Sequence, residues 1–140
     1  MRKKIAQYLK YNPRNKLIFT PKIDPNLHSV DVGFELASII KNDLASPFLP
    51  MVAEDCFNSI MRKSTFHDEI LGDYIAISNW GILFEPELKL NLLSLFDSYS
   101  KGQTLILVNC GEADNECFHL VSKYFNTTLD LGTLTPYIIS

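Results

Sequence analysis

Several features that would assign this chain to a particular class of protein are missing from its sequence. No apolar run approaches the ~20 residues that a membrane-spanning helix requires. The basic first residues are followed by neither the apolar core nor the cleavage site of a signal peptide. We therefore expect a cytoplasmic protein with no membrane segment.

Cysteine is scarce, and its spacing excludes the common cysteine-based sites. The three cysteines, Cys56, Cys110 and Cys117, form no CxxC pair, and any disulfide would leave one of them over. Free thiols in a reducing compartment are the simplest interpretation. Cys56 lies in an apolar helical stripe, where a thiol serves as a small core side chain.

Metal-ligand spacing is also absent near the one cluster that suggests it. His67 is followed by Asp68 and Glu69, but no second histidine lies nearby in the sequence. A zinc site usually draws on at least three such ligands. We therefore expect a surface turn at residues 65–71, and no metal or other cofactor.

The composition is that of a soluble globular domain. With 140 residues, 46% apolar and 21% charged, the chain can bury a real core as one domain spanning residues 1–140. Its net charge of −3 gives no general attraction to nucleic acid or to anionic membranes. The basic start, Arg2, Lys3 and Lys4, is most simply a solvated helix face, and contact with a partner or with DNA is the alternative.

A strand, helix and strand at residues 72–111 form the unit around which the chain is organised. Residues 74–78 and 104–109 are continuous apolar runs, which suit strands covered on both faces, as in a parallel sheet. Between them Leu90, Leu93 and Phe96 recur at helical spacing. The pattern predicts a right-handed βαβ unit.

The remaining segments predict further layers on this unit. Pro136 places the last strand at a sheet edge, and Ser29 is the expected N-cap of the second helix. The connector 45–50 is compatible with a short strand. The expected fold is a three-layer α/β/α domain with a mostly parallel sheet. Helices are predicted near residues 5–9, 29–43, 51–64, 92–100 and 113–125, and further strands at 16–20 and 133–139.

The loop at residues 21–29 stands where a parallel sheet commonly binds phosphate, because it joins the first strand to a helix. A phosphate-binding loop needs glycines and a Lys-Ser/Thr pair. This loop has two prolines, no glycine, and Lys22 separated from Ser29 by six residues. Lys22 is therefore expected to be a solvated loop lysine, and a phosphate ligand is the less favoured alternative.

The run from Ile77 to Leu90, ISNWGILFEPELKL, resembles the Walker B region of the small P-loop protein of BREX phage-exclusion systems. In that family an apolar strand ends in an Asp-Asn-like pair and is followed by a similar Leu-Phe-x-Pro-x-Leu-Lys stretch. The resemblance implies a P-loop NTPase-like fold. It also implies vestigial nucleotide-site positions at Lys22, Ser29, Asn79 and Asn109.

The departures from that family concern the groups that do its chemistry. P-loop enzymes hold Mg²⁺ through an aspartate at the end of the Walker B strand, whereas this strand ends in Ser78 and Asn79. The glycine loop is missing as well. The resemblance therefore implies a domain without ATP hydrolysis that acts as a binding or regulatory subunit, with a protein partner in a multi-subunit antiviral complex.

The turn that follows the Asn79 strand is the expected partner-binding site. Trp80, Phe84, Glu85 and Glu87 come directly after a buried strand, at the sheet edge where open α/β folds bind ligands. An exposed Trp80 would be a natural interface anchor. A Trp80 packed against the following helix is the equal alternative.

Two other functions are compatible with the residues. Cys110 closes a strand and precedes a predicted helix, so that His119 as base and Glu112 as its orienting carboxylate would make a small cysteine-dependent hydrolase. The G-x-C-x-G signature is lacking, and a structural thiol is the simpler interpretation. An immunity or inhibitor-type protein fits the acidic balance and the absence of a catalytic constellation.

Overall fold

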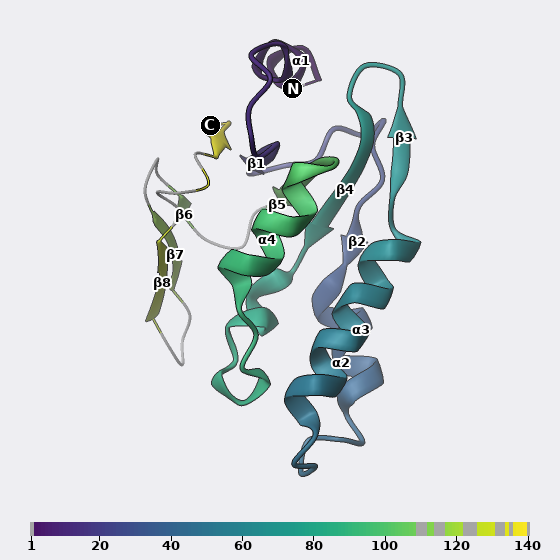
Figure 1. Ribbon diagram of the computed structural model, residues 1–140, viewed down its shortest axis with the longest axis vertical. Helices are drawn as coiled ribbons and strands as arrows, with labels where there is room; N and C mark the ends of the chain where they lie inside the picture. Colours follow the sequence, from purple (N-terminus) through teal and green to yellow (C-terminus); the bar gives the residue numbers. More distant parts are fainter. Residues whose placement is uncertain are drawn as a thin grey trace.

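A six-stranded, mostly parallel β-sheet lies at the centre of the molecule (Figure 1). The computed structural model describes residues 2–108, 112–113, 117–121, 126–130, 134 and 136–139. One of the six strands, β3 (Phe66–Asp68), pairs antiparallel with the first half of β4, and the other five are parallel. The parallel strands follow the order β2 (Val30–Asp31), β4 (Gly72–Ser78), β5 (Thr104–Val108), β1 (Leu17–Thr20) and β9 (Tyr137–Ile138).

The central βαβ unit is confirmed. Helix α4 (Leu92–Lys101) connects β4 to β5, and these two strands pair in parallel from Tyr74↔Thr104 to Ile77↔Leu107. Every residue of β5 is buried, as its continuous apolar run predicted. The same holds for the middle of β4, which explains why neither strand shows an alternating pattern.

One face of the sheet is covered by helices α2 (Val32–Ile40), α3 (Leu49–Lys63) and α4. Alternate residues of each strand point to the same face, so Ile75 and Ile77 join the helices in one core. The predicted helices at 29–43 and 51–64 are thus present with slightly shifted ends. The connector 45–50 contains turns and the first two residues of α3, and no strand.

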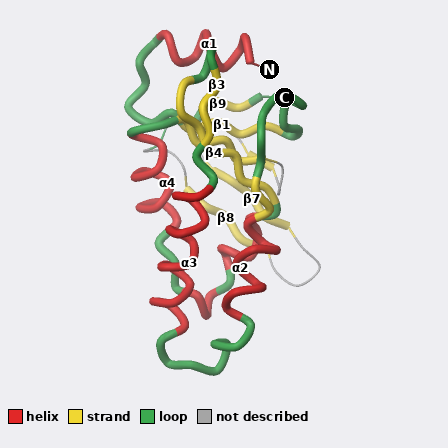
Figure 2. Tube along the Cα trace, turned by 90° about the vertical axis from the view of Figure 1, so that its right-hand side faces the viewer, coloured by secondary structure: helices red, strands yellow, loops and turns green. Residues whose placement is uncertain are grey.

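The other face is covered by α1 (Arg2–Lys10) and by the loop 21–29. Ile5 of α1 and Leu27 of the loop are buried with Tyr74 and its neighbours, and the His28 amide donates a hydrogen bond to the Tyr74 hydroxyl at 2.9 Å. The three layers are therefore α2–α4, the sheet, and α1 with this loop. Figure 2 shows α1 at one end of the molecule, away from α2 and α3.

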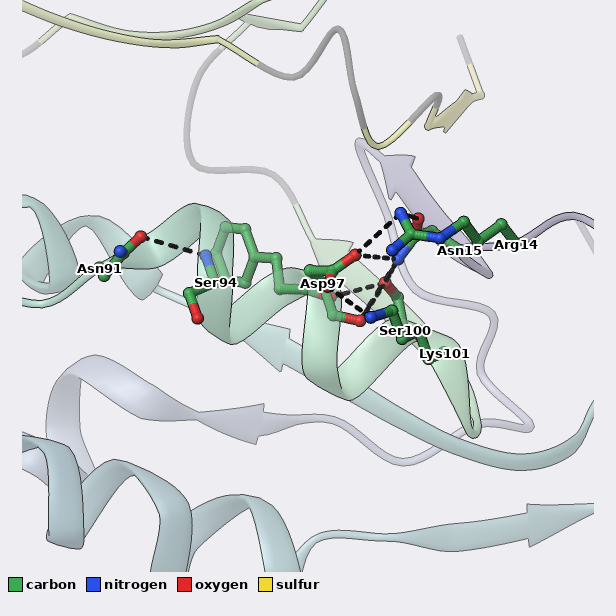
Figure 3. Close-up of polar contacts among 8 residues, drawn as sticks. Arg14, Asn15, Asn91, Ser94, Asp97, Ser100 and Lys101 are labelled. Atoms are coloured by element: carbon green, nitrogen blue, oxygen red, sulfur yellow. Dashed lines mark hydrogen bonds and ion pairs between the residues drawn. The ribbon is translucent and has the colours of Figure 1, made fainter.

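A buried polar cluster ties the start of β1 to the end of α4 (Figure 3). Asn15 is only 1% exposed, and its amide donates to Asp97 Oδ1 at 3.0 Å and to Ser100 Oγ at 2.9 Å. Arg14 and Lys101 form ion pairs with the Asp97 carboxylate at 3.3 and 2.8 Å. Lys101 and Asn15 together lower the pKa of Asp97.

The predicted N-cap of the second helix is wrong. Asp31 caps α2 by accepting a hydrogen bond from the Phe34 amide at 2.9 Å, whereas Ser29 lies before β2 and is exposed. The two residues of β2 pair with the end of β4 and delay the helix start. An aspartate directly before the first periodic apolar residue is the sequence signal for this cap.

The predicted helix at 113–125 is also wrong. The backbone there forms β6 (Glu112–Ala113) and β7 (Cys117–Val121), which pair antiparallel, and β7 pairs with β8 (Asn126–Asp130). Phe118 and Leu120 alternate with His119, and two threonines follow in β8, a composition that favours strands. The closing strand is confirmed as β9 at the sheet edge, directly after Pro136.

Candidate functional site

The carboxyl ends of β1, β2, β4 and β5 meet at one edge of the sheet, because these strands are parallel. Ligands of open α/β folds bind outside such an edge. The sequence analysis predicted that the candidate site residues lie at this edge, and the structure shows where each described one lies.

The loop after β1 does not form an anion cradle. The Thr20 hydroxyl donates to the Lys22 carbonyl oxygen at 2.8 Å, and the chain then crosses the sheet face toward β2. The side chains of Lys22 and Ser29 are exposed. Among the residues that the structure describes, no hydrogen bond or ion pair joins either of them to Asn79. Asn109 lies outside the described residues.

Asn79 is held by the start of α2. Its backbone is left-handed, with φ 50° and ψ 43°, and its amide donates to Asp31 Oδ1 at 2.9 Å. The same carboxylate oxygen caps α2 through Phe34. A Cβ added to Gly33 would lie only 2.5 Å from the Asn79 carbonyl oxygen, so only glycine allows this close approach. The end of β4 and the first turn of α2 thus form one interlocked contact.

Trp80 is fully buried, and the prediction of an exposed aromatic at this turn is wrong. Its indole Nε1 donates to the Val108 carbonyl oxygen at 3.1 Å. The ring packs edge-on against Phe96 of α4, at a centroid distance of 5.8 Å, and tilted against Phe19 of β1 at 6.0 Å. Trp80 therefore joins β4 to β5, β1 and α4, as the alternative interpretation expected.

The rest of the predicted partner-binding turn is accessible. Two short 3-10 helices, η1 (Trp80–Phe84) and η2 (Pro86–Leu88), follow β4. Phe84 is half-buried and packs against the Trp80 ring, while Glu85 and Glu87 are exposed. Leu88 is buried in the core and anchors the turn.

The sequence analysis missed three exposed apolar side chains of the α2–α3 connection and the first turn of α3. Leu44 and Phe48 are each 63% exposed, and Met51 is 59% exposed. Figure 1 shows this connection at the same end of the molecule as the teal segment between β4 and α4. The sequence does indicate their exposure, because these residues lie around Pro47 and Pro50, outside the apolar stripe of α3.

Of the two thiols that the sequence analysis discussed singly, the structure describes the side chain of Cys56. Cys56 is half-buried beside the core of α3, as expected, and its burial raises the pKa of the thiol. Cys110 lies outside the described residues. His119 belongs to a strand instead of the predicted helix, and the antiparallel register places Glu112 opposite it.

No metal-binding group of three His, Cys, Asp or Glu occurs within the described ranges. His67 Nδ1 instead lies 3.0 Å from Asp73 Oδ1, across the β3–β4 pair. In the same ranges, the helices are too short or too polar to cross a membrane. Searches of protein families, curated proteins and solved structures found no match to this chain.

Proposed function

We propose that this protein is a non-catalytic, P-loop-like binding or regulatory subunit of a cytoplasmic bacterial anti-phage defence complex. Two features support the proposal. The run ISNWGILFEPELKL resembles the BREX P-loop protein, and it follows an inner strand of a mostly parallel sheet. At the carboxyl edge, Trp80 packs in the core and Asp31 caps α2.

The contact between Asn79 and Asp31 is the observation that carries the non-catalytic part. The resemblance aligns the end of β4, Ser78 and Asn79, with the strand end that carries the Mg²⁺ carboxylate in P-loop enzymes. Here a hydroxyl and an amide occupy those positions, and the hydrogen bond from the Asn79 amide to Asp31 fixes it against α2. Asp31 Oδ1 already accepts two hydrogen bonds, one from Asn79 and one from Phe34. The chain therefore lacks the metal carboxylate and the glycine loop, two groups with which P-loop enzymes stabilise the charge that develops in phosphoryl transfer.

The binding part of the proposal rests on the surface at the lower end of the molecule in Figure 1. Exposed carboxylates of Glu85 and Glu87 lie on the turn after β4. Exposed Leu44 and Phe48 lie on the α2–α3 connection, and exposed Met51 lies in the first turn of α3. Interfaces commonly combine an apolar centre with a polar rim. This end therefore fits a protein partner whose apolar contact face carries lysines or arginines at its border.

Co-expression with the products of the adjacent genes tests the proposal. The double variant Glu85→Lys/Glu87→Lys should lose the co-purifying partner, with its melting temperature unchanged because both side chains are exposed. The matched control is Glu69→Lys, an exposed charge reversal in the β3–β4 hairpin at the other end of the molecule. Equal partner recovery from wild type and double variant would contradict the proposed surface.

One observation favours a second candidate, the cysteine-dependent hydrolase. The β6–β7 register pairs Glu112 with His119, two residues that the hydrolase interpretation uses as orienting group and base. Alkylation by iodoacetamide at neutral pH distinguishes the candidates. Rapid, selective modification of Cys110 that is slowed by His119→Ala would favour the hydrolase, because the thiolate is the reactive form. Slow modification, unaffected by that substitution, would favour the binding subunit.

A further inference from the structure

An open pocket of about 750 Å³ lies between α1 and the edge strand β9, at the opposite end of the molecule from the α2–α3 connection. Both termini of the described chain come together there (Figure 1). The side chains around the pocket are either aromatic or basic, with one glutamine. They are Lys4, Gln7, Tyr8, Lys10, Tyr11 and Tyr137.

A stacked pair of tyrosines forms the rigid part of this pocket. The rings of Tyr8 and Tyr137 lie 5.0 Å apart between centroids, with an interplanar angle of 18°. The Tyr8 hydroxyl donates to the Asn15 carbonyl oxygen at 2.7 Å. Asn15 is in turn hydrogen-bonded to Ser100 of α4. The tyrosine pair is therefore connected to α1, to β9 and, through Asn15, to α4.

Tyr11 presents a third ring that the protein leaves in water, at 87% exposure. Its position is set by the end of α1: the Tyr11 amide bonds to the Tyr8 carbonyl at 3.2 Å, and Asn12 turns the chain with φ 51°. Lys4, Gln7, Tyr8 and Tyr11 recur at helical spacing on one side of α1. The exposed ring and Lys4 therefore share one surface, and Lys10 lines the same pocket.

The charge of the N-terminal segment, which supplies five of the six residues around the pocket, is opposite to that of the rest of the chain. Seven of the 13 lysines and arginines occur in the first 22 residues, where no aspartate or glutamate occurs. All 16 acidic residues follow, with only six basic ones among them. Lys4 and Lys10 are exposed, and neither forms an ion pair within the described part of the chain. The net charge of −3 therefore hides a basic segment at the start of the chain, and two of its exposed lysines line the pocket.

We propose that this pocket binds single-stranded nucleic acid, with a base stacked on Tyr11 and the adjacent phosphates bound by Lys4 and Lys10. Exposed aromatic rings beside lysines are the combination that binds unpaired bases together with their backbone. A duplex keeps its bases stacked inside and offers no face to Tyr11. The inference is independent of the partner surface at the other end of the molecule.

The fold argues against a membrane as the occupant of this basic surface. An amphipathic helix binds lipid by inserting its apolar face below the headgroups. The apolar face of α1 is already used, because Ile5 is buried and Leu9 is partly buried against the sheet. Only the polar and aromatic side of α1 faces outward.

Fluorescence anisotropy with labelled oligo(dT) and oligo(U) of about 12 nucleotides tests the proposal, with the full chain titrated over a range of salt. Lys4→Ala and Lys10→Ala should each reduce the slope of log K against log salt by ~0.7. Tyr11→Ala should weaken binding about tenfold through lost stacking, and Tyr11→Trp should retain it. Comparison of oligo(U) with oligo(dU), which differ only in the 2′-hydroxyl, shows whether the sugar is read.

Matched controls separate this site from general effects of charge and exposed rings. Lys41→Ala removes an exposed lysine at the end of α2, and Phe48→Ala removes an exposed ring next to α3. Both should leave oligonucleotide affinity unchanged. All the substituted side chains are exposed, so the melting temperature should stay the same.

Three results would overturn the proposal. One is the absence of an anisotropy change at low salt with either oligomer. Another is binding that Tyr11→Ala leaves intact, since stacking would then play no part. The third is co-sedimentation of the protein with phosphatidylserine vesicles in preference to oligonucleotide, which would assign the basic end to a membrane surface.

Discussion

The indole nitrogen of Trp80 donates a hydrogen bond of 3.1 Å to the carbonyl oxygen of Val108, joining the carboxyl ends of two neighbouring strands. Trp80 is fully buried, and its ring also contacts Phe96 of the crossover helix. The residue after β4 is therefore part of the core. A partner bound at this edge would therefore meet the side chains around Trp80.

Substitution of Trp80 should destabilise the protein strongly. Trp80→Ala removes a buried ring and should cost ~3–5 kcal/mol of unfolding free energy. Trp80→Phe keeps most of the volume but leaves the Val108 carbonyl without this donor, at a cost of ~1–3 kcal/mol. Urea denaturation measures both, and Phe48→Ala, an exposed ring, should change stability by less than ~0.5 kcal/mol. An Ala variant as stable as the wild type would refute the core role.

Gly33 and Gly102 form a matched pair for testing the interlock between α2 and β4. In Gly33→Ala the new Cβ would meet the backbone oxygen of Asn79 at 2.5 Å, so the end of β4 must shift. We expect a loss of ~1–3 kcal/mol. Gly102→Ala meets nothing within 4 Å and has an ordinary φ of −91°. It should be neutral or stabilising by up to ~1 kcal/mol. Similar thermal shifts for both variants would contradict the interlock.

Asp97 should contribute stability that disappears in acid. Its hydrogen bonds from Lys101 and Asn15 lower its folded-state pKa, below the value of about 3.9 expected in the unfolded chain. The contribution is therefore fully present above the unfolded pKa and is lost as the pH falls through the folded pKa. Asp97→Asn should be less stable than wild type near neutral pH, with the difference shrinking in acid.

Urea midpoints for wild type and Asp97→Asn, measured near neutral pH and at acid pH, test this expectation. Glu69→Gln, which changes an exposed carboxylate in the β3–β4 hairpin, is the control and should show no such dependence. A difference for Asp97→Asn that is the same at both pH values would assign its role to shape and hydrogen bonding, independent of charge.

The central βαβ unit could be predicted from the sequence because its signals, apolar runs and apolar spacing, lie within each strand or helix. The continuous apolar runs of β4 and β5 and the apolar stripe of α4 identify buried strands and a crossover helix. The segment 113–125 was misassigned because a short apolar run fits either period, and its pairing with β8 decided the outcome.

The candidate sites depended on contacts between distant segments, which the sequence does not show. Trp80 was open to two interpretations because its hydrogen-bond acceptor, Val108, lies on another strand. The basic start looked like a solvated helix face because Tyr137, which stacks on Tyr8, comes from the other end of the chain. Ser29 was predicted as the cap because the pairing of β2 with β4, which delays the start of α2, joins segments that are distant in the sequence.

Calorimetric titration with ATP and Mg²⁺ is the measurement that tests the central claim most directly. The account predicts no binding heat at micromolar ATP, because the end of β4 offers the amide of Asn79, already bonded to Asp31, in place of a metal carboxylate. The loop 21–29 likewise lacks glycine. A Mg²⁺-dependent isotherm that Lys22→Ala abolishes would contradict the account and restore a working nucleotide site.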